Sequence, residues 1–248
     1  MSSLWGALES EVGRWRDAGK TVEFWWRDDD ACKPSAQLER LLALAHSAHV
    51  PLALAVIPLA FDAVILGDRF APAYLMQHGT DHQNRAGSGE KKTEFAAHEP
   101  VAQALARLRH ARTVVETSAP GHQLQVLVPP WNRIASASLI TELANAGYRG
   151  LSRFGPRTSG SAHGLVQVNT HVDIIDWHGG RGFAGADVAL AQALGHLQAK
   201  RLCQVDAAEP TGWLTHHAVH DGACWEFLHR LLQRTARWES VRWVRPDF

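Results

Sequence analysis

Two histidines and a run of three aspartates are the residues of this 248-residue chain best suited to metal chemistry. His78 and His82 are four positions apart, so a helical turn would place both imidazoles on one side. Two imidazoles at that spacing can bind one zinc ion together with a carboxylate, and a fourth position is left for water. Asp28, Asp29 and Asp30 are consecutive, and a nearby cation would relieve their mutual repulsion. Taken singly, the run of aspartates also fits a solvated turn or a helix cap.

Three further clusters of reactive side chains follow segments that are typical of strands. They are Pro129-Pro-Trp-Asn-Arg133, the segment from His171 to His178 with Asp173, Asp176 and Trp177, and the pair His216-His217. The carboxyl ends of parallel strands meet on one face of an α/β protein, and sites form there. We therefore expect these clusters to converge with the aspartates and the two histidines on one site.

Strands and helices alternate along the chain. Candidate strands lie at residues 22–26, 51–58, 73–77, 125–128, 150–154, 166–169, 212–215 and 241–244, and candidate helices begin near Leu4, Ser35, Glu99, Ser136, Val188 and Trp225. This alternation predicts a mostly parallel sheet of about seven strands. That number of strands at this length favours a barrel over an open sheet, in a single domain that covers residues 1–248.

The composition excludes several classes of protein. Hydrophobic residues make up 46% and charged residues 20%, which rules out a disordered chain and a coiled coil. The formal net charge is +0, so no excess of charge favours nucleic acid or an anionic membrane. The 3 cysteines are widely spaced, which excludes a disulfide framework and a cysteine zinc knuckle. No apolar run reaches the ~18 residues of a membrane span, and residues 1–20 hold no leader-like apolar run, so we expect a cytoplasmic protein.

The order of these clusters resembles that of the polysaccharide deacetylase family, also called the NodB-homology family or carbohydrate esterase family 4. The similar motifs run from Asp28 to His216, which is most of the chain. The resemblance implies a distorted (β/α) barrel that removes N-acetyl or O-acetyl groups from sugars with the help of a divalent metal. The residues at the motif positions of this chain are typical of a divergent branch of the family.

The first two motifs of the family supply the metal ligands and the catalytic base. Arg27-Asp-Asp-Asp30 resembles the first motif, and the match places the base at Asp28 and a metal ligand at Asp29. His78-Gly-Thr-Asp-His82 resembles the second motif, which makes both histidines ligands. Zn²⁺ is the ion we expect, although two imidazoles and a carboxylate also suit Co²⁺, Ni²⁺ or Fe²⁺.

The remaining motifs supply groups that act on the substrate. Pro129-Pro-Trp-Asn resembles the third motif, so Trp131 would give a backbone N–H to the oxyanion. Asp173-Ile-Ile-Asp-Trp177 resembles the fourth, whose last aspartate, Asp176, would orient the catalytic histidine. Leu214-Thr-His216 resembles the fifth, whose histidine, His216, would be the general acid.

The chain departs from the family pattern at three points. Asp30 replaces the glycine that usually follows the aspartate pair, and Val128 stands where the third motif has an arginine that holds the base. Arg27 or Arg133 could take the place of that arginine. The alignment can also shift by one residue, which would make Asp29 the base and Asp30 the ligand, or put His217 in place of His216.

The sequence therefore predicts a metal-dependent hydrolase that removes an acetyl group from a carbohydrate or glycoconjugate precursor. In this hypothesis the metal polarises the carbonyl, Asp28 takes a proton from the attacking water, and His216 protonates the leaving amine. The partner is a carbohydrate or small acetylated substrate, with no nucleic acid and no membrane, and no oligomeric state is predicted. Two alternatives stay open: a catalytically impaired relative that binds a glycan, and a hydrolase of a non-sugar amide bond.

Overall fold

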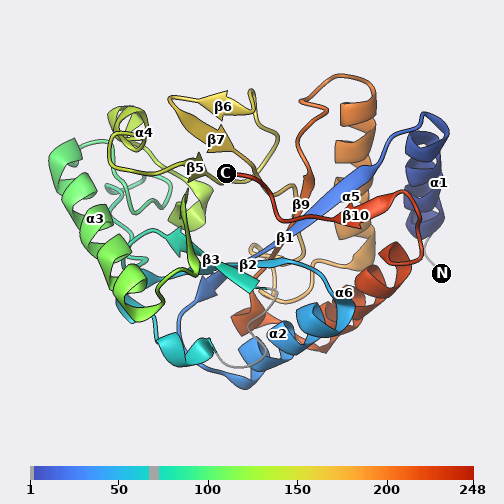
Figure 1. Cartoon of the computed structure of the whole chain (residues 1–248), viewed down its shortest axis with the longest axis horizontal. Helices are drawn as coiled ribbons and strands as arrows, with labels where there is room; N and C mark the ends of the chain where they lie inside the picture. Colours follow the sequence, from blue (N-terminus) through green and yellow to red (C-terminus); the bar gives the residue numbers. More distant parts are fainter. Residues whose placement is uncertain (1–2, 67–72) are drawn as a thin grey trace.

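The computed structural model describes residues 3–66 and 73–248, and it consists of one curled sheet with helices around its outside (Figure 1). The strands are β1 (Val22–Ala31), β2 (Leu52–Val56), β3 (Ala73–His78), β4 (Gln123–Val128), β5 (Gly150–Leu151), β6 (Ser161–Ala162), β7 (Leu165–Gln167), β8 (Val172–Asp173), β9 (Thr211–Thr215) and β10 (Val241–Trp243). The helices are α1 (Ser3–Asp17), α2 (Ala36–Ala48), α3 (Val101–Ser118), α4 (Ala137–Glu142), α5 (Ala186–Arg201) and α6 (Gly222–Thr235). This is the predicted α/β class.

The sheet is an open, distorted barrel. Its strand order is β6-β7-β5-β4-β3-β2-β1-β9-β8, and β10 pairs with β1. All neighbours are parallel except β6 and β7. Within the described residues the end strands β6 and β8 do not pair with each other, so the barrel does not close.

In the described part of the chain the sheet has ten strands, where the sequence predicted about seven. The additional strands include β6 and β8, which are two residues long. Such short strands leave no periodicity in the sequence, and β6 lies in what reads as a Gly- and Ser-rich loop. Helix α2 begins where the sequence predicted, and Ser35 caps it, because its hydroxyl accepts the N–H of Leu38 at 3.1 Å.

Strand β1 lies inside the sheet and pairs with β2, β9 and β10. Three consecutive aromatic residues of β1, Phe24, Trp25 and Trp26, are all buried, as expected for a parallel sheet that is covered on both faces. The Trp26 indole N–H donates to the Thr215 hydroxyl at 2.9 Å and so joins β1 to β9. The register pairs Asp28 with Thr215, so the carboxyl ends of these two strands meet.

The carboxyl ends of β3 and β4 meet at the same edge of the sheet, because His78 pairs with Val128. The chain segments that follow β1, β3, β4 and β9 therefore surround one region, as the sequence predicted for a parallel sheet. Across the described ranges, no helix combines the length and the apolarity that a bilayer-spanning segment requires.

Gly212 allows β9 to pack closely on its neighbours. A Cβ at this position would lie 2.6 Å from the carbonyl oxygen of Asn169 and 2.7 Å from Cα of Thr170, and it would also meet the Trp25 indole.

We expect Gly212→Ala to lower the free energy of unfolding by ~1–3 kcal/mol in urea titrations, because rigid backbone must move. Gly13→Ala is the control: nothing lies within 4 Å of that Cβ, and alanine favours helix α1 by ~0.5–1 kcal/mol. Equal stability of the two variants would contradict this packing.

Candidate functional site

Asp30, His78 and His82 form a cluster in which one ligand atom of each lies within 4.8 Å of the others. The Asp30 Oδ1 atom is 3.1 Å from Nε2 of His78 and 3.2 Å from Nε2 of His82. Asp30 comes from the end of β1, His78 is the last residue of β3, and His82 lies in the turn that follows. The two predicted imidazoles are thus together, and the carboxylate beside them is that of Asp30.

The donor set of this cluster fits a divalent metal. Nδ1 of His78 lies 3.0 Å from the carbonyl oxygen of Val128, which can only accept, so Nδ1 carries the proton and Nε2 of the neutral ring keeps its lone pair. That lone pair faces the Asp30 Oδ1 atom, which is buried and has no hydrogen-bond partner among the described residues. Two facing lone pairs repel each other, and a cation between them relieves the repulsion. One carboxylate and two imidazoles suit Zn²⁺ and related ions.

Asp29, the ligand that the sequence match indicated, is directed elsewhere. Its carboxylate accepts two hydrogen bonds from the Arg27 guanidinium, at 2.8 Å from Nε and 3.0 Å from Nη2. Residues 27 and 29 share one face of the strand, since side chains alternate along it. A register shift between Asp28 and Ala31, together with a left-handed backbone at Asp30 (φ 68°), directs Asp30 to the histidines. The geometry therefore favours the alternative alignment, with Asp30 as the ligand.

Arg27, one of the two arginines that the sequence offered in place of the missing third-motif arginine, holds Asp29. It is fully buried, and besides Asp29 it donates to the Ser152 hydroxyl at 2.7 Å and to the Asn132 side-chain oxygen at 2.7 Å. Arg133, the other candidate, donates to the carbonyl of Lys92 instead. Asp29 is thus a carboxylate held in one orientation by a buried guanidinium, as a catalytic base requires.

Asp28, the expected base, has no free side to act on a substrate. Its carboxylate accepts from the Thr215 hydroxyl at 2.6 Å, from the His217 backbone N–H at 3.0 Å, and from His217 Nδ1 at 2.5 Å. Burial raises the pKa of Asp28, but the charge and hydrogen bond of His217 more than offset burial, so this pKa is lowered. Asp28 therefore joins the ends of β1 and β9, and it forms hydrogen bonds with both the backbone and the imidazole of His217.

His216 lies at the end of β9 beside the fourth motif. Its ring packs edge-on against the Trp177 indole, with the ring centroids 4.6 Å apart. Its Nδ1 atom is buried without a hydrogen-bond partner among the described residues. The Trp177 indole N–H in turn donates to Asp173 at 2.8 Å. Burial raises the pKa of Asp173, and the positive charge of His216 opposes that rise, so these two groups act on each other.

Asp176, which the sequence match paired with His216, has a different place. It is exposed, and its carboxylate accepts the backbone N–H groups of His178 and Gly179 at 3.1 and 2.9 Å. These bonds stabilise a surface turn. Asp173 is the aspartate of this motif that lies near His216, through the Trp177 ring between them. Its spacing of four residues from Trp177 is the sequence feature that could have indicated this contact.

Trp131 lies in a tight turn after β4, the 3-10 helix η3 (Pro130–Asn132), and its ring packs against His82 with centroids 4.5 Å apart. Trp131 and Asn132 both have left-handed backbone, each with φ of 54°. Together with Asp30 and His82, they account for four of the eight non-glycine residues of the described ranges that have positive φ. Such strained backbone collects at functional sites.

A second buried cluster, His171, His196 and Glu209, also has three ligand atoms within 4.8 Å of one another. Here Nδ1 of His171 accepts the backbone N–H of Gly212 at 3.0 Å, so the neutral ring carries its proton on Nε2, which lies 3.2 Å from Glu209. That Nε2 has no lone pair to offer, and the carboxylate of Glu209 already accepts two backbone N–H groups. This donor set does not fit a metal.

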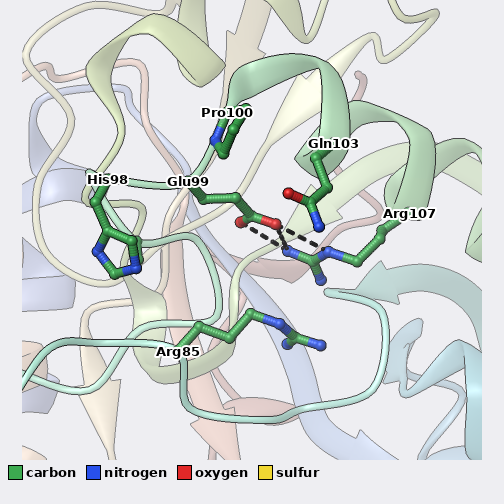
Figure 2. A pocket seen from close by; sticks show the side chains of 7 residues that line it. Arg85, His98, Glu99, Pro100, Gln103 and Arg107 are labelled. Atoms are coloured by element: carbon green, nitrogen blue, oxygen red, sulfur yellow. Dashed lines mark hydrogen bonds and ion pairs between the residues drawn. The ribbon is translucent and has the colours of Figure 1, made fainter.

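A cavity of about 390 Å³ lies between Arg85 and the first turns of α3, which carry Gln103 and Arg107 (Figure 2). It is lined by Arg85, Ala96, His98, Glu99, Pro100, Gln103 and Arg107. Both of its guanidinium groups are already paired: Arg107 with Glu99 at 2.8 Å, and Arg85 with Asp81 at 2.7 Å. The cavity therefore presents no unpaired arginine to an anionic ligand, and it contains none of the metal-centre residues.

Comparisons with known proteins identify the fold. No family model matches the chain, and no curated protein matches it significantly in sequence. Among solved structures, a family 4 carbohydrate esterase from Streptomyces lividans in complex with acetate is 17% identical, with a TM-score of 0.58 over 91% of this chain and 98% of that one.

Two more solved structures are similar. An acetyl xylan esterase of family 4 from Clostridium thermocellum, solved with a cobalt ion, is 13% identical with a TM-score of 0.52 over 90% of this chain and 87% of that one. A polysaccharide deacetylase from Bacillus cereus is 12% identical with a TM-score of 0.52 over 92% and 93%. The chain therefore has the fold shared by polysaccharide deacetylases and family 4 carbohydrate esterases.

The hydrogen-bond pattern predicts one metal ion per chain. We expect untagged protein to bind one equivalent of Zn²⁺ in plasma emission measurements, and His78→Ala or Asp30→Asn to lose it, because each removes one of three ligands. His196→Ala, in the second cluster, is the matched control and should keep the full equivalent. Retention by the first two variants with loss in the third would contradict the assignment.

Proposed function

We propose that this protein is a metal-dependent hydrolase that removes an acetyl group from an N-acetylated or O-acetylated carbohydrate or glycoconjugate precursor. The observation that carries the proposal is the grouping of Asp30, His78 and His82 beside a second carboxylate, Asp29, that a buried arginine holds. Hydrolysis of an acyl group needs this division, because one carboxylate holds the ion while the other, which does not bind the ion, accepts a proton.

Asp29 is the proposed general base, in place of Asp28. It lies close enough to the centre that its charge, with that of Asp30, raises the pKa of His78 although burial alone would lower it. A divalent ion bound by the three ligands would polarise the acetyl carbonyl and lower the pKa of a water molecule. Asp29 takes the proton of the attacking water, and Arg27 keeps its carboxylate in position.

His216 is the proposed general acid, and the backbone N–H of Trp131 is the proposed donor to the developing oxyanion. Expulsion of an amine needs an acid, because an amide anion is a very poor leaving group. The Trp177 ring packs edge-on against the imidazole of His216 and holds it in place, and the Trp177 indole N–H donates to Asp173 at 2.8 Å. His216 then gives its proton to the leaving nitrogen or oxygen.

Two indole rings beside the centre support a carbohydrate substrate. The ring of Trp131 lies against His82, and the ring of Trp177 lies against His216 and is 39% exposed. Flat apolar faces next to polar groups suit the binding of sugar rings. Zn²⁺ is the proposed ion, with Co²⁺, Ni²⁺ or Fe²⁺ as alternatives, and the cytoplasmic location stays a prediction.

The impaired, glycan-binding alternative loses its main support. It rested on the missing arginine of the third motif, and Arg27 makes the corresponding contact with Asp29. The hydrolase of a non-sugar amide bond would use the same residues, so the choice between the two depends on substrate.

Acetate release tests the proposed function. Chito-oligosaccharides, nucleotide sugars and small N-acyl amides are offered to the untagged protein before and after treatment with a chelator. We expect release from at least one acetylated sugar, loss of release with the chelator, and recovery on addition of Zn²⁺ or Co²⁺. Release only from N-acyl amides would favour the second alternative. No release at all, or release that the chelator does not affect, would contradict the proposal.

The roles of Asp29 and His216 predict loss of rate without loss of metal. We expect Asp29→Asn and His216→Ala to lower kcat by about 10²–10⁴-fold, the usual contribution of acid–base catalysis, and to bind Zn²⁺ as the wild type does. Steady-state kinetics and metal content are measured on the same samples. If Asp29→Asn loses the ion while Asp30→Asn keeps it, the two aspartates have been assigned in the wrong order.

The two aspartates of the fourth motif should differ in effect. Asp173→Asn replaces the carboxylate that accepts the Trp177 indole N–H beside His216, so we expect kcat to fall because the general acid is held less firmly. Asp176→Asn, at the exposed turn, should leave kcat unchanged. The reverse result would restore Asp176 as the partner of the acid.

A further inference from the structure

One fully buried carboxylate, Glu94, lies beside the turn that joins the metal ligands His78 and His82. Its Oε1 atom accepts the backbone N–H of Thr80 at 2.8 Å, and it also accepts the Thr80 hydroxyl. Its Oε2 atom accepts the backbone N–H of His82 at 3.2 Å. The carboxylate therefore contacts the turn through its backbone at both of its oxygens.

The backbone of this turn has the form that binds an anion. Gly79 and His82 both have left-handed backbone, with φ of 62° and 56°. Successive N–H groups around such residues point inward and form a concave anion site. A Cβ at residue 79 would collide with Oε2 of Glu94 and would lie 2.7 Å from the ring of Pro130, so glycine is required for the carboxylate to approach. Glu94 occupies that concave site.

The charge of Glu94 is balanced from helix α3. Arg107 donates to Glu94 Oε1 at 3.3 Å and to the Thr80 hydroxyl at 3.1 Å. Its other nitrogens form the pair with Glu99 that Figure 2 shows. A buried carboxylate without such a partner would be unfavourable. The helix is thus connected through Arg107 and Glu94 to the loop that carries a metal ligand.

We propose that Glu94 is a positioning residue that sets the metal affinity of the centre by holding the left-handed backbone of His82. This proposal rests on the metal centre of the proposed function. Glu94 contacts the backbone of His82, and its effect therefore reaches the ion through the orientation of that imidazole. Groups that orient metal ligands typically change metal affinity by about 10–100-fold when they are removed.

The test is a measurement of Zn²⁺ affinity, by competition with a chromophoric chelator, on the metal-free protein and its variants. We expect Glu94→Gln to weaken Zn²⁺ binding by about 10–100-fold, because one oxygen acceptor becomes an amide donor that faces the N–H groups of the turn. Glu94→Asp keeps the charge opposite Arg107 but is one methylene too short to reach both N–H groups, so we expect weakening there too. If Glu94→Gln does not fold, the Zn²⁺ affinity of Glu94→Asp tests the role of Glu94.

Glu99→Gln is the matched control. Glu99 bonds to the same guanidinium of Arg107 but is not among the residues that contact the turn, so Zn²⁺ affinity should stay at the wild-type value. Thermal unfolding of each metal-free variant separates a general loss of stability from a change at the centre. Unchanged Zn²⁺ affinity in folded Glu94→Gln and Glu94→Asp, or an equal loss in Glu99→Gln, overturns the role of Glu94. Absence of Zn²⁺ binding by the wild type would instead overturn the metal centre itself.

Discussion

The buried ion pair between Arg27 and Asp29 is the interaction on which the arrangement of this site depends. Both side chains are almost fully buried, and removing one partner of such a pair typically costs ~3–5 kcal/mol. The guanidinium uses its remaining donors on Ser152 and Asn132, which follow β5 and β4. The pair therefore fixes one aspartate and also connects the end of β1 to two neighbouring strand ends.

Three adjacent carboxylates of one strand have three different environments. Asp28 is occupied by Thr215 and His217, Asp29 by Arg27, and Asp30 faces the two imidazoles. Asp28 and Asp29 each have a partner within the protein, whereas Asp30 is left to face the two imidazoles, where a cation would relieve the repulsion. Residues of identical chemistry can then have different functions, which their surroundings decide.

The two clusters of histidine and carboxylate differ in the backbone group that faces Nδ1 of the first histidine. Nδ1 of His78 faces a carbonyl oxygen, whereas Nδ1 of His171 faces a backbone N–H. The first contact places the proton on Nδ1 and leaves Nε2 able to bind a metal, and the second places the proton on Nε2. A group of three suitable side chains is therefore not sufficient, because the backbone around each ring decides whether a lone pair is available.

The sequence by itself determined the alternation of strands and helices, the convergence of polar clusters at the strand ends, and the pairing of His78 with His82. These properties follow from local periodicity and from short spacings, which the chain carries directly. It left the choice between Asp29 and Asp30 open, and it paired Asp176 with His216, whereas the structure places Asp176 in an exposed turn after β8. A register shift and a left-handed residue at the end of β1 decide where the aspartate side chains point, and neither leaves a local signal. Only the tertiary structure decided that Arg27 holds Asp29 and that Glu94 holds the turn of His82, since those contacts depend on how strands and loops distant in sequence pack together.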